Sequence, residues 1–170
     1  MKIPYLSAFY AKHQICLDNL IIDEESNAYS ACSFSLDSKR IVYRKANTTP
    51  KKIGQFVAIW KRNKLGETAP YQDTDSLDAL IIAVETATHR GQFIFPRELL
   101  VKKNILSSST KLGKRGIRVY PSWDTPTNKQ AIKTQQWQLD YFVNFNEDAA
   151  QITKELKERL SFNVPVYNRS

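Results

Sequence analysis

The sequence has few of the residues that build covalent or metal-bound scaffolds. Its 170 residues include 2 cysteines, Cys16 and Cys32, and 2 histidines, His13 and His89. Two cysteines outside any CxxC pair do not form a disulfide framework or a redox pair. Two isolated histidines exclude a His-rich metal site, and no Walker loop, GxGxxG, GxSxG or HExxH pattern is present. We therefore expect neither a cofactor nor a bound metal.

Long apolar runs are also missing. No stretch reaches the roughly 18 apolar residues of a transmembrane helix, and the first residues lack the apolar run of a signal peptide. We expect a cytoplasmic protein with reduced thiols and no membrane insertion. Tracts of Gly, Ser or Pro and repeats of solenoid length are absent, so the simplest organisation is a single domain over residues 1–170.

Positive charge is what the sequence has in excess. There are 25 Lys and Arg against 17 Asp and Glu, a net charge of +8. The surplus is concentrated: residues 39–64 contain nine basic residues and no acid, and residues 97–118 contain seven basic residues and one acid, Glu98. Charge segregated in this way favours a polyanionic partner. The alternative is a solvated basic face that only keeps the protein soluble.

Hydrophobic periodicity predicts alternating helices and strands. Helices are expected over residues 4–15, from Thr49 onward, over residues 97–103 (as a short helix or turn), over residues 131–145, and after a cap at Asn146. Strands are expected from Leu20 to Ile22 and over residues 29–36, 40–45, 78–85, 91–95 and 117–120. This order indicates an α/β (α+β) fold with a central mixed β-sheet flanked by helices.

The segment that begins at Thr49 has the clearest helix signals. Thr49 can act as N-cap, a proline follows at the first helical position, and apolar residues recur at helical spacing. Lys51 and Lys52 would then occupy a first turn that normally favours acids. Backbone N–H groups, the Thr49 hydroxyl and these lysines would bind a phosphate, with Arg44 and Lys45 leading into the site. Two solvated lysines are the alternative.

A second candidate segment, KRGIRVYPSW at residues 114–123, combines charge with aromatic rings. Strand alternation places Arg118 and Tyr120 on one face. Lys114 and Arg115 precede this pair and Trp123 follows it. Together these side chains could hold a phosphate and stack on a base, although Trp123 could instead belong to the core.

Three glutamines, at positions 135, 136 and 138, flank Trp137 on the long predicted helix. Glutamine amides can pair with adenine edges, but polar residues around a tryptophan are also ordinary on a helix surface. We expect these three on the surface.

The order of elements over residues 4–85 resembles the restriction-endonuclease-like core. In those nucleases an acid stands two residues before a lysine on a strand that enters a helix, and this acid binds Mg²⁺. Here Tyr43 stands two residues before Lys45, and residues 40–64 contain no carboxylate. We therefore expect a degenerate core that lacks its metal site.

A catalytic alternative remains at the triplet Asp37-Ser38-Lys39, which has the spacing of a nuclease acid and lysine. Glu24 or Glu25 would supply the second acid for a Mg²⁺-dependent nuclease. A hairpin turn is the favoured interpretation of the triplet, because Asp and Ser are common turn residues.

Three longer segments resemble the MepB family: TPKKIGQFVAIWK (residues 49–61), GQFIFPRELLVKKNIL (residues 91–106) and GKRGIRVYPSWDTPTNKQAIKTQQWQLDYF (residues 113–142). The resemblance implies a small bacterial protein of the kind often encoded beside a multidrug efflux pump, in a family without an established biochemical activity. It allows a third function, a small-molecule or partner-binding accessory of multidrug resistance, which would need an aromatic pocket near Trp60, Trp123 and Trp137.

The leading hypothesis is a non-catalytic protein that binds DNA or RNA mainly through phosphate contacts. Either nucleic acid fits the charge, and the oligomeric state stays open. The residues expected to bind are Arg44, Lys45, Thr49, Lys51, Lys52, Lys114, Arg115, Arg118, Tyr120 and Trp123.

Overall fold

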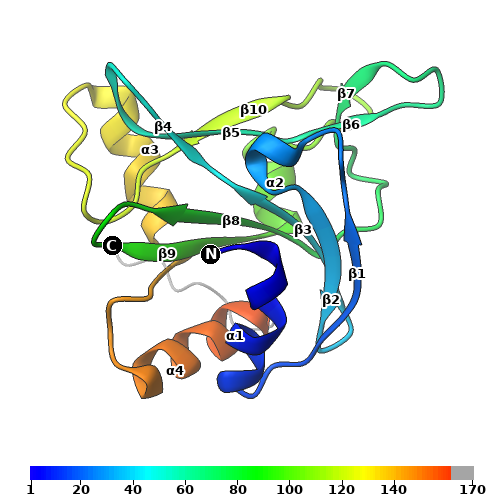
Figure 1. Cartoon of the computed structure of the whole chain (residues 1–170). Helices are drawn as coiled ribbons and strands as arrows, with labels where there is room; N and C mark the ends of the chain where they lie inside the picture. Colours follow the sequence, from blue (N-terminus) through cyan, green and yellow to red (C-terminus); the bar gives the residue numbers. More distant parts are fainter. Residues whose placement is uncertain (162–170) are drawn as a thin grey trace.

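The computed structural model describes residues 1–161, and it stacks its elements in layers on the two faces of one sheet (Figure 1). The helices are η1 (Ile3–Tyr5), α1 (Leu6–Lys12), η2 (Asn27–Tyr29), α2 (Arg97–Lys102), α3 (Lys129–Leu139) and α4 (Ala149–Leu160). The strands are β1 (Leu17–Ile22), β2 (Cys32–Leu36), β3 (Lys39–Lys45), β4 (Asn47–Thr49), β5 (Lys52–Ala58), β6 (Trp60–Arg62), β7 (Thr68–Pro70), β8 (Ala79–Glu85), β9 (Arg90–Pro96), β10 (Gly116–Val119) and β11 (Phe142–Asn144).

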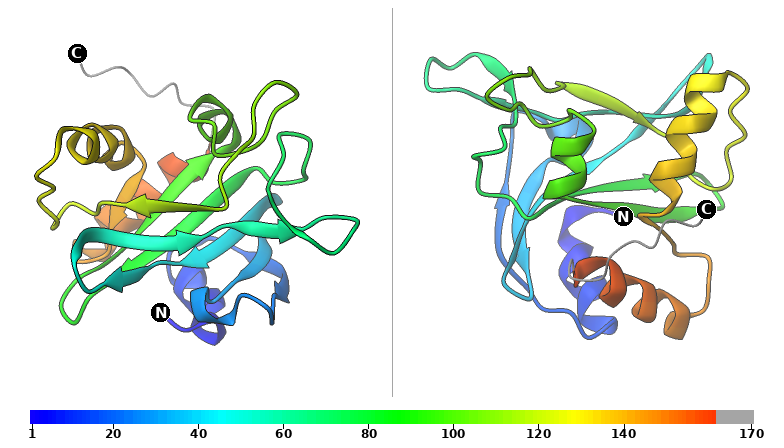
Figure 2. Two further views of the ribbon diagram at one scale, coloured as in Figure 1. Left: turned by 90° about the horizontal axis from the view of Figure 1, so that it is seen from above. Right: turned by 180° about the vertical axis from the view of Figure 1, so that it is seen from behind.

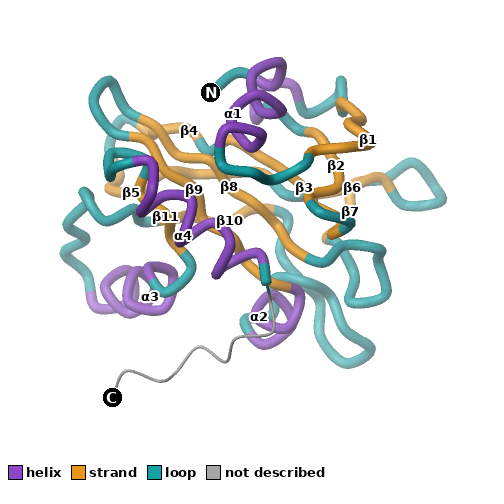
Figure 3. Tube along the Cα trace, turned by 90° about the horizontal axis from the view of Figure 1, so that it is seen from below, coloured by secondary structure: helices purple, strands orange, loops and turns teal. Residues whose placement is uncertain are grey.

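The main sheet has the strand order β1-β2-β3-β8-β9-β11. Strands β3 and β8 are parallel, and the other neighbours are antiparallel. Helices α1 and α4 cover one face of this sheet (Figure 3). A three-stranded sheet, β10-β5-β4, lies with α2 and α3 on the opposite side (Figures 1 and 2). The predicted central mixed sheet flanked by helices is confirmed.

Strand β8 is buried on both faces, and its alternating side chains divide the interior into two cores. Leu80, Ile82 and Val84 pack toward the β10-β5-β4 sheet and α2. Ala79, Ile81 and Ala83 pack toward α1 and α4. An uninterrupted apolar run is what a strand between two such layers requires.

The helix predicted to begin at Thr49 does not form. Thr49 ends β4, a turn follows, and β5 pairs with β4 and β10. Gln55, Val57 and Ile59 alternate on the buried side, and the polar Gln55 concealed this period of two in the sequence. Gly54 has a φ of +83°, which is foreign to an α-helix. The expectation of a phosphate site at a helix N-terminus formed by Thr49 is therefore wrong.

The helix predicted over residues 131–145 is shorter than expected. It ends at Leu139, and Phe142–Asn144 becomes β11, which pairs with β9. The cap predicted at Asn146 is also displaced, because Asp148 accepts the hydrogen bond from the Gln151 N–H at the start of α4. The expected last helix is confirmed as α4, which buries Ile152, Leu156 and Leu160.

The hairpin predicted at Asp37-Ser38 is confirmed. Asp37 and Ser38 have φ values of 45° and 70° and join β2 to β3. Two successive positive φ values are typical of a two-residue I′ turn, whose twist matches that of the strands. Within the described part of the chain, no helix is long and apolar enough to cross a membrane.

Candidate nucleic-acid interface

A cleft of about 540 Å³ runs along the outer edge of β10, between this strand, the segment after α2 and helix α3. Four cationic side chains line it, from Lys52, Lys103, Lys114 and Arg118, together with the rings of Phe56, Tyr120 and Trp137. Among residues 1–161, no Asp or Glu lines this cleft. Positive charge without a compensating acid, next to aromatic rings, is a combination that favours the binding of nucleic acids.

Two glycines give two of the rings their positions. A Cβ at Gly54 would lie 2.7 Å from Cδ1 of Tyr120, and a Cβ at Gly116 would lie 2.6 Å from Cζ of Phe56. Each ring thus lies directly against a strand backbone. In both cases any larger residue would displace the ring from the cleft wall.

Lys103 and Trp137 form a cation–π pair at the opposite wall. The Lys103 Nζ lies 4.9 Å from the indole centroid. The indole also packs against Phe95, at 5.5 Å between ring centroids and with the two ring planes tilted by 49°. Trp137 is therefore anchored in the core while part of its ring faces the cleft.

Gln138 joins the two walls. Its Oε1 accepts the Tyr120 N–H at 2.9 Å, and its Nε2 donates to the Arg118 carbonyl at 3.0 Å. Gln135 adds two bonds from its Nε2, to the carbonyls of Pro121 at 3.1 Å and Asp124 at 2.8 Å. Gln138 is only 1% exposed, so the surface position expected for it is wrong. These amides act as structural links because an edge strand has backbone groups to satisfy.

The N-terminus of α3 also lines the cleft. The Asn128 side chain accepts the Ala131 N–H at 2.8 Å, and the first turn contains Lys129 and no acid. A helix N-terminus carries roughly half a positive charge, which adds to the field of the four cations. The sequence placed this kind of feature at Thr49, whereas the structure places it here.

The structure brings together Lys52, Lys114, Arg118 and Tyr120 of the predicted binding residues. Sequence reasoning missed Lys103 and Phe56, and it considered Trp137 only for the small-molecule alternative. These residues lie directly after α2, in β5 and in α3. Lys103 lay inside the second basic segment, so charge segregation was the available signal.

Other predicted residues lie outside the cleft lining but near the same sheet. Arg115 is exposed and donates to the Thr68 carbonyl through Nη2 at 3.2 Å. Lys51 is exposed in the β4–β5 turn. The Thr49 hydroxyl is buried, and no residue of the described range accepts or donates a hydrogen bond to it. Trp123 packs edge-on against Phe142 and stacks on a histidine ring, as the core interpretation predicted.

Arg44 and Lys45 are separated from the cleft. Arg44 is 2% exposed, and its Nη1 and Nη2 donate to the Tyr43 carbonyl at 2.8 Å and the Tyr71 hydroxyl at 3.2 Å. Lys45 is bonded to Glu85. The folded protein therefore offers neither cation to a ligand in this cleft.

Lys45 and Glu85 end the adjacent parallel strands β3 and β8, and Lys45 is the lysine that the expected nuclease pattern would use. Glu85 accepts from the Lys45 Nζ and from the Met1 amine, the latter at 2.5 Å. Burial alone would raise the pKa of Glu85, but the hydrogen bonds and charges of Lys45 and the Met1 amine outweigh it and lower the pKa to about 2. Two positive groups therefore face this one carboxylate.

Tyr43, which interacts with Glu85, and the buried Tyr10 and Cys32 are neutral. Burial raises the pKa of Tyr43 and of Tyr10, and it raises the pKa of Cys32 to about 12. Mg²⁺ needs several oxygen ligands, usually with more than one carboxylate between protein and substrate. One carboxylate neutralised by two cations does not fit this metal, and residues 1–161 contain no group of three or more His, Cys, Asp or Glu that could hold one.

The alternative nuclease residues do not meet. In the antiparallel β1–β2 pair, Leu17 lies opposite Leu36 and Ile22 lies opposite Cys32. Asp37 therefore lies at one end of this pair, and Glu24 and Glu25 follow the other end. Asp37 accepts the Cys16 N–H, and Glu25 pairs with Arg62. The proposed cluster of Asp37, Lys39 and these glutamates is not formed.

The aromatic pocket expected for a small-molecule sensor is not formed either. Trp60 lies under the Arg62 guanidinium, at 5.1 Å from the ring centroid. Trp123 is in contact with Phe142, and Trp137 alone of the three tryptophans lines the cleft.

A family model described as MepB-like matches residues 23–144, a range that includes every lining residue of the cleft. The chain belongs to the MepB-like family. A solved structure described as the crystal structure of MepB is 35% identical, with a TM-score of 0.77 over 87% of this chain and 100% of that one. The bacterial homing endonuclease I-Ssp6803I is 11% identical, with a TM-score of 0.41 over 78% of this chain and 84% of its own. No curated protein matches this MepB-like chain.

Proposed function

We propose that the protein binds DNA or RNA through the cleft between β10 and α3, and that it does so without cutting the strand. The observation that supports this function best is the composition of the cleft: four cations, three aromatic rings and, within the described residues, no carboxylate. Phosphate contacts supply most of the affinity of such a surface, and aromatic faces supply stacking.

The distribution of ion pairs supports the same proposal. The salt bridges within residues 1–161 join Met1 and Lys45 to Glu85, Lys61 to Asp75 and Arg62 to Glu25. None of them uses a cation of the cleft. The Arg118 guanidinium is instead steadied by the carbonyls of Ile53 and Gly54, at 3.4 and 3.3 Å, which leave its charge uncompensated.

The test is a binding titration with labelled DNA and RNA oligonucleotides over a range of salt concentrations. With four phosphate contacts, log K should fall with log salt with a slope of about 0.7–0.9 per contact, or roughly 50- to 150-fold between about 50 and 200 mM salt. A double variant, Lys114→Glu with Arg118→Glu, should abolish measurable binding. An affinity that does not change with salt concentration would overturn the proposal.

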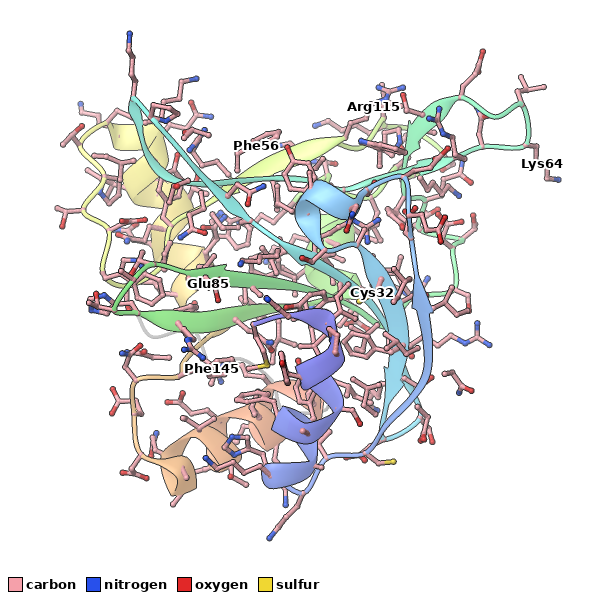
Figure 4. The ribbon with its side chains drawn as sticks, viewed as in Figure 1. Cys32, Phe56, Lys64, Glu85, Arg115 and Phe145 are labelled. Carbon is pink, nitrogen blue, oxygen red and sulfur yellow. The ribbon has the colours of Figure 1, made fainter. Side chains whose placement is uncertain are left out.

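A matched control keeps the change in net charge constant. Lys64 lies at the tip of the β6–β7 hairpin, far from Phe56 (Figure 4), and Lys154 is exposed on α4. The double variant Lys64→Glu with Lys154→Glu should therefore bind as the parent does. Equal losses in both double variants would show that only net charge matters and that the cleft is not the site.

The absence of cutting is tested separately, by incubating the complex with Mg²⁺ or Mn²⁺ and following the length of the oligonucleotide. We expect intact strands. Cleavage that is lost in Glu85→Gln would overturn the non-catalytic part of the proposal and would assign a reaction to the Lys45–Glu85 pair.

A further inference from the structure

The outer edge of β10 has an open hydrogen-bonding position in its middle. At one end the Lys114 N–H donates to the Ile105 carbonyl at 3.0 Å. At the other end the Gln138 amide bonds the Arg118 carbonyl and the Tyr120 N–H. In an antiparallel strand, alternate residues direct their backbone groups to the same side. The Gly116 carbonyl and the Arg118 N–H therefore point in the same direction as the pair that Gln138 occupies.

This open pair faces the cleft. Gly116 and Arg118 both line it, and β5 is bonded to the intervening residues, such as Ile117, which is registered with Val57. Within residues 1–161, no backbone or side-chain group bonds the Arg118 N–H. The Gly116 carbonyl and the Arg118 N–H together fit a planar group that has a donor next to an acceptor. The Gln138 amide is such a group, and it bonds the next pair along the strand in that way.

A nucleobase is such a planar group. Adenine, for example, presents the N6 amino donor beside an acceptor nitrogen. The rings of Phe56, Tyr120 and Trp137 line the same cleft and give it the aromatic surface on which a base can pack. A cleft of about 540 Å³ accommodates single bases and not a duplex, because pockets of about 300–1,000 Å³ enclose ligands of small-molecule size.

We propose that the open pair on β10 hydrogen-bonds the edge of an unpaired nucleobase, so that the cleft takes single-stranded nucleic acid with one base inserted beside Trp137. This inference rests on the proposed function and restricts it to strands whose bases are free. A base in a duplex keeps a free groove edge, but its faces are covered by the neighbouring bases and it cannot be inserted beside Trp137.

The test compares three ligands of one sequence: a single strand, its duplex, and a single strand with abasic positions throughout. The single strand should bind at least roughly tenfold more tightly than the duplex, and removal of the stacked base should cost about 5- to 150-fold. Binding should quench tryptophan fluorescence, and this quenching should be lost in Trp137→Phe while the chain stays folded.

Substitution of purine for adenine in the single strand removes the exocyclic donor that the Gly116 carbonyl would accept. We expect weaker binding of this strand. Equal affinity for all strands, with the full salt dependence retained, would overturn the inference and leave the proposed function standing. No binding of any ligand would instead overturn the proposed function. A free mononucleotide that binds as tightly as the oligonucleotide would also overturn the inference, because the ligand would then not be a strand.

Discussion

The side-chain amide of Gln138 bonds the backbone at Tyr120 in the way that the backbone of a neighbouring strand would. Its Oε1 accepts the Tyr120 N–H at 2.9 Å, and the same side chain donates to the Arg118 carbonyl. One buried residue thus joins helix α3 to the edge of β10 and sets the separation of the two cleft walls. This link makes Gln138 the residue through which stability and ligand binding are coupled.

We expect Gln138→Leu to lower both the stability and the affinity for nucleic acid. The substitution leaves two backbone groups without partners, which costs about 1–3 kcal/mol of unfolding free energy. It also frees α3 from β10, so affinity should fall although every cation remains. Urea unfolding and the oligonucleotide titration measure the two effects. Gln136→Leu, at an exposed position on the same helix, is the control and should change neither quantity.

Gly54 and Gly66 provide a second matched pair, because both have positive φ, +83° and +78°. Gly66→Ala adds a Cβ in open space and should cost only the conformational penalty of about 1–2 kcal/mol. Gly54→Ala adds the same penalty and also clashes with the Tyr120 ring, so it should be clearly more destabilising and should weaken binding. Equal effects in thermal unfolding would show that Tyr120 is not held against Gly54.

Much of the fold could be predicted from the sequence, for reasons that are local. The apolar run of residues 79–84 and the Asp37-Ser38 turn are recognised from neighbouring residues in the chain alone. The segment after Thr49 could not be assigned correctly, because its apolar residues fit a helical period almost as well as a strand. Pairing with β10, about 60 residues further along the chain, decides in favour of the strand.

The candidate site was predicted in part for a related reason. Arg118 lies on β10 and Tyr120 directly follows this strand, two residues later, so their common face follows from continued strand alternation. Lys103 and Trp137 meet only because α2 and α3 pack on the same side of the main sheet, and no local spacing indicates that contact. Nor does composition reveal that Arg44 is buried, since basic residues are usually solvated.

Arg44 is a cation outside the cleft, so its replacement tests whether net positive charge alone determines the binding of nucleic acid. It is buried and bonded to the Tyr43 carbonyl and the Tyr71 hydroxyl, with its Nε unsatisfied within the described residues. Replacing buried ionic groups by well-packed apolar side chains is often neutral or stabilising when no charge is left unpaired, and among residues 1–161 no carboxylate forms a salt bridge with Arg44. We expect Arg44→Met to unfold at the same or a higher urea concentration and to bind oligonucleotides as the parent does. A fall in affinity at unchanged stability would place Arg44 in the binding site.

The pH dependence of stability should depend measurably on Glu85. Its pKa is about 2 in the folded protein and roughly 4.3 in an unfolded chain. A carboxyl group with a lowered folded pKa contributes stability that is present above the unfolded value and is lost as the pH falls toward the folded one. Glu85→Gln should therefore reduce the unfolding free energy by about 1–2 kcal/mol at neutral pH, an amount discounted for partial exposure of the pair. The deficit relative to the parent should shrink as the pH falls from about 4.5 to about 2, and denaturant titrations at several pH values measure it.

Glu158→Gln, at an exposed position on α4, should follow the parent at every pH. A deficit that is constant with pH would mean that the lost contacts of Glu85 are steric and that its charge contributes nothing to the ion pair with Lys45.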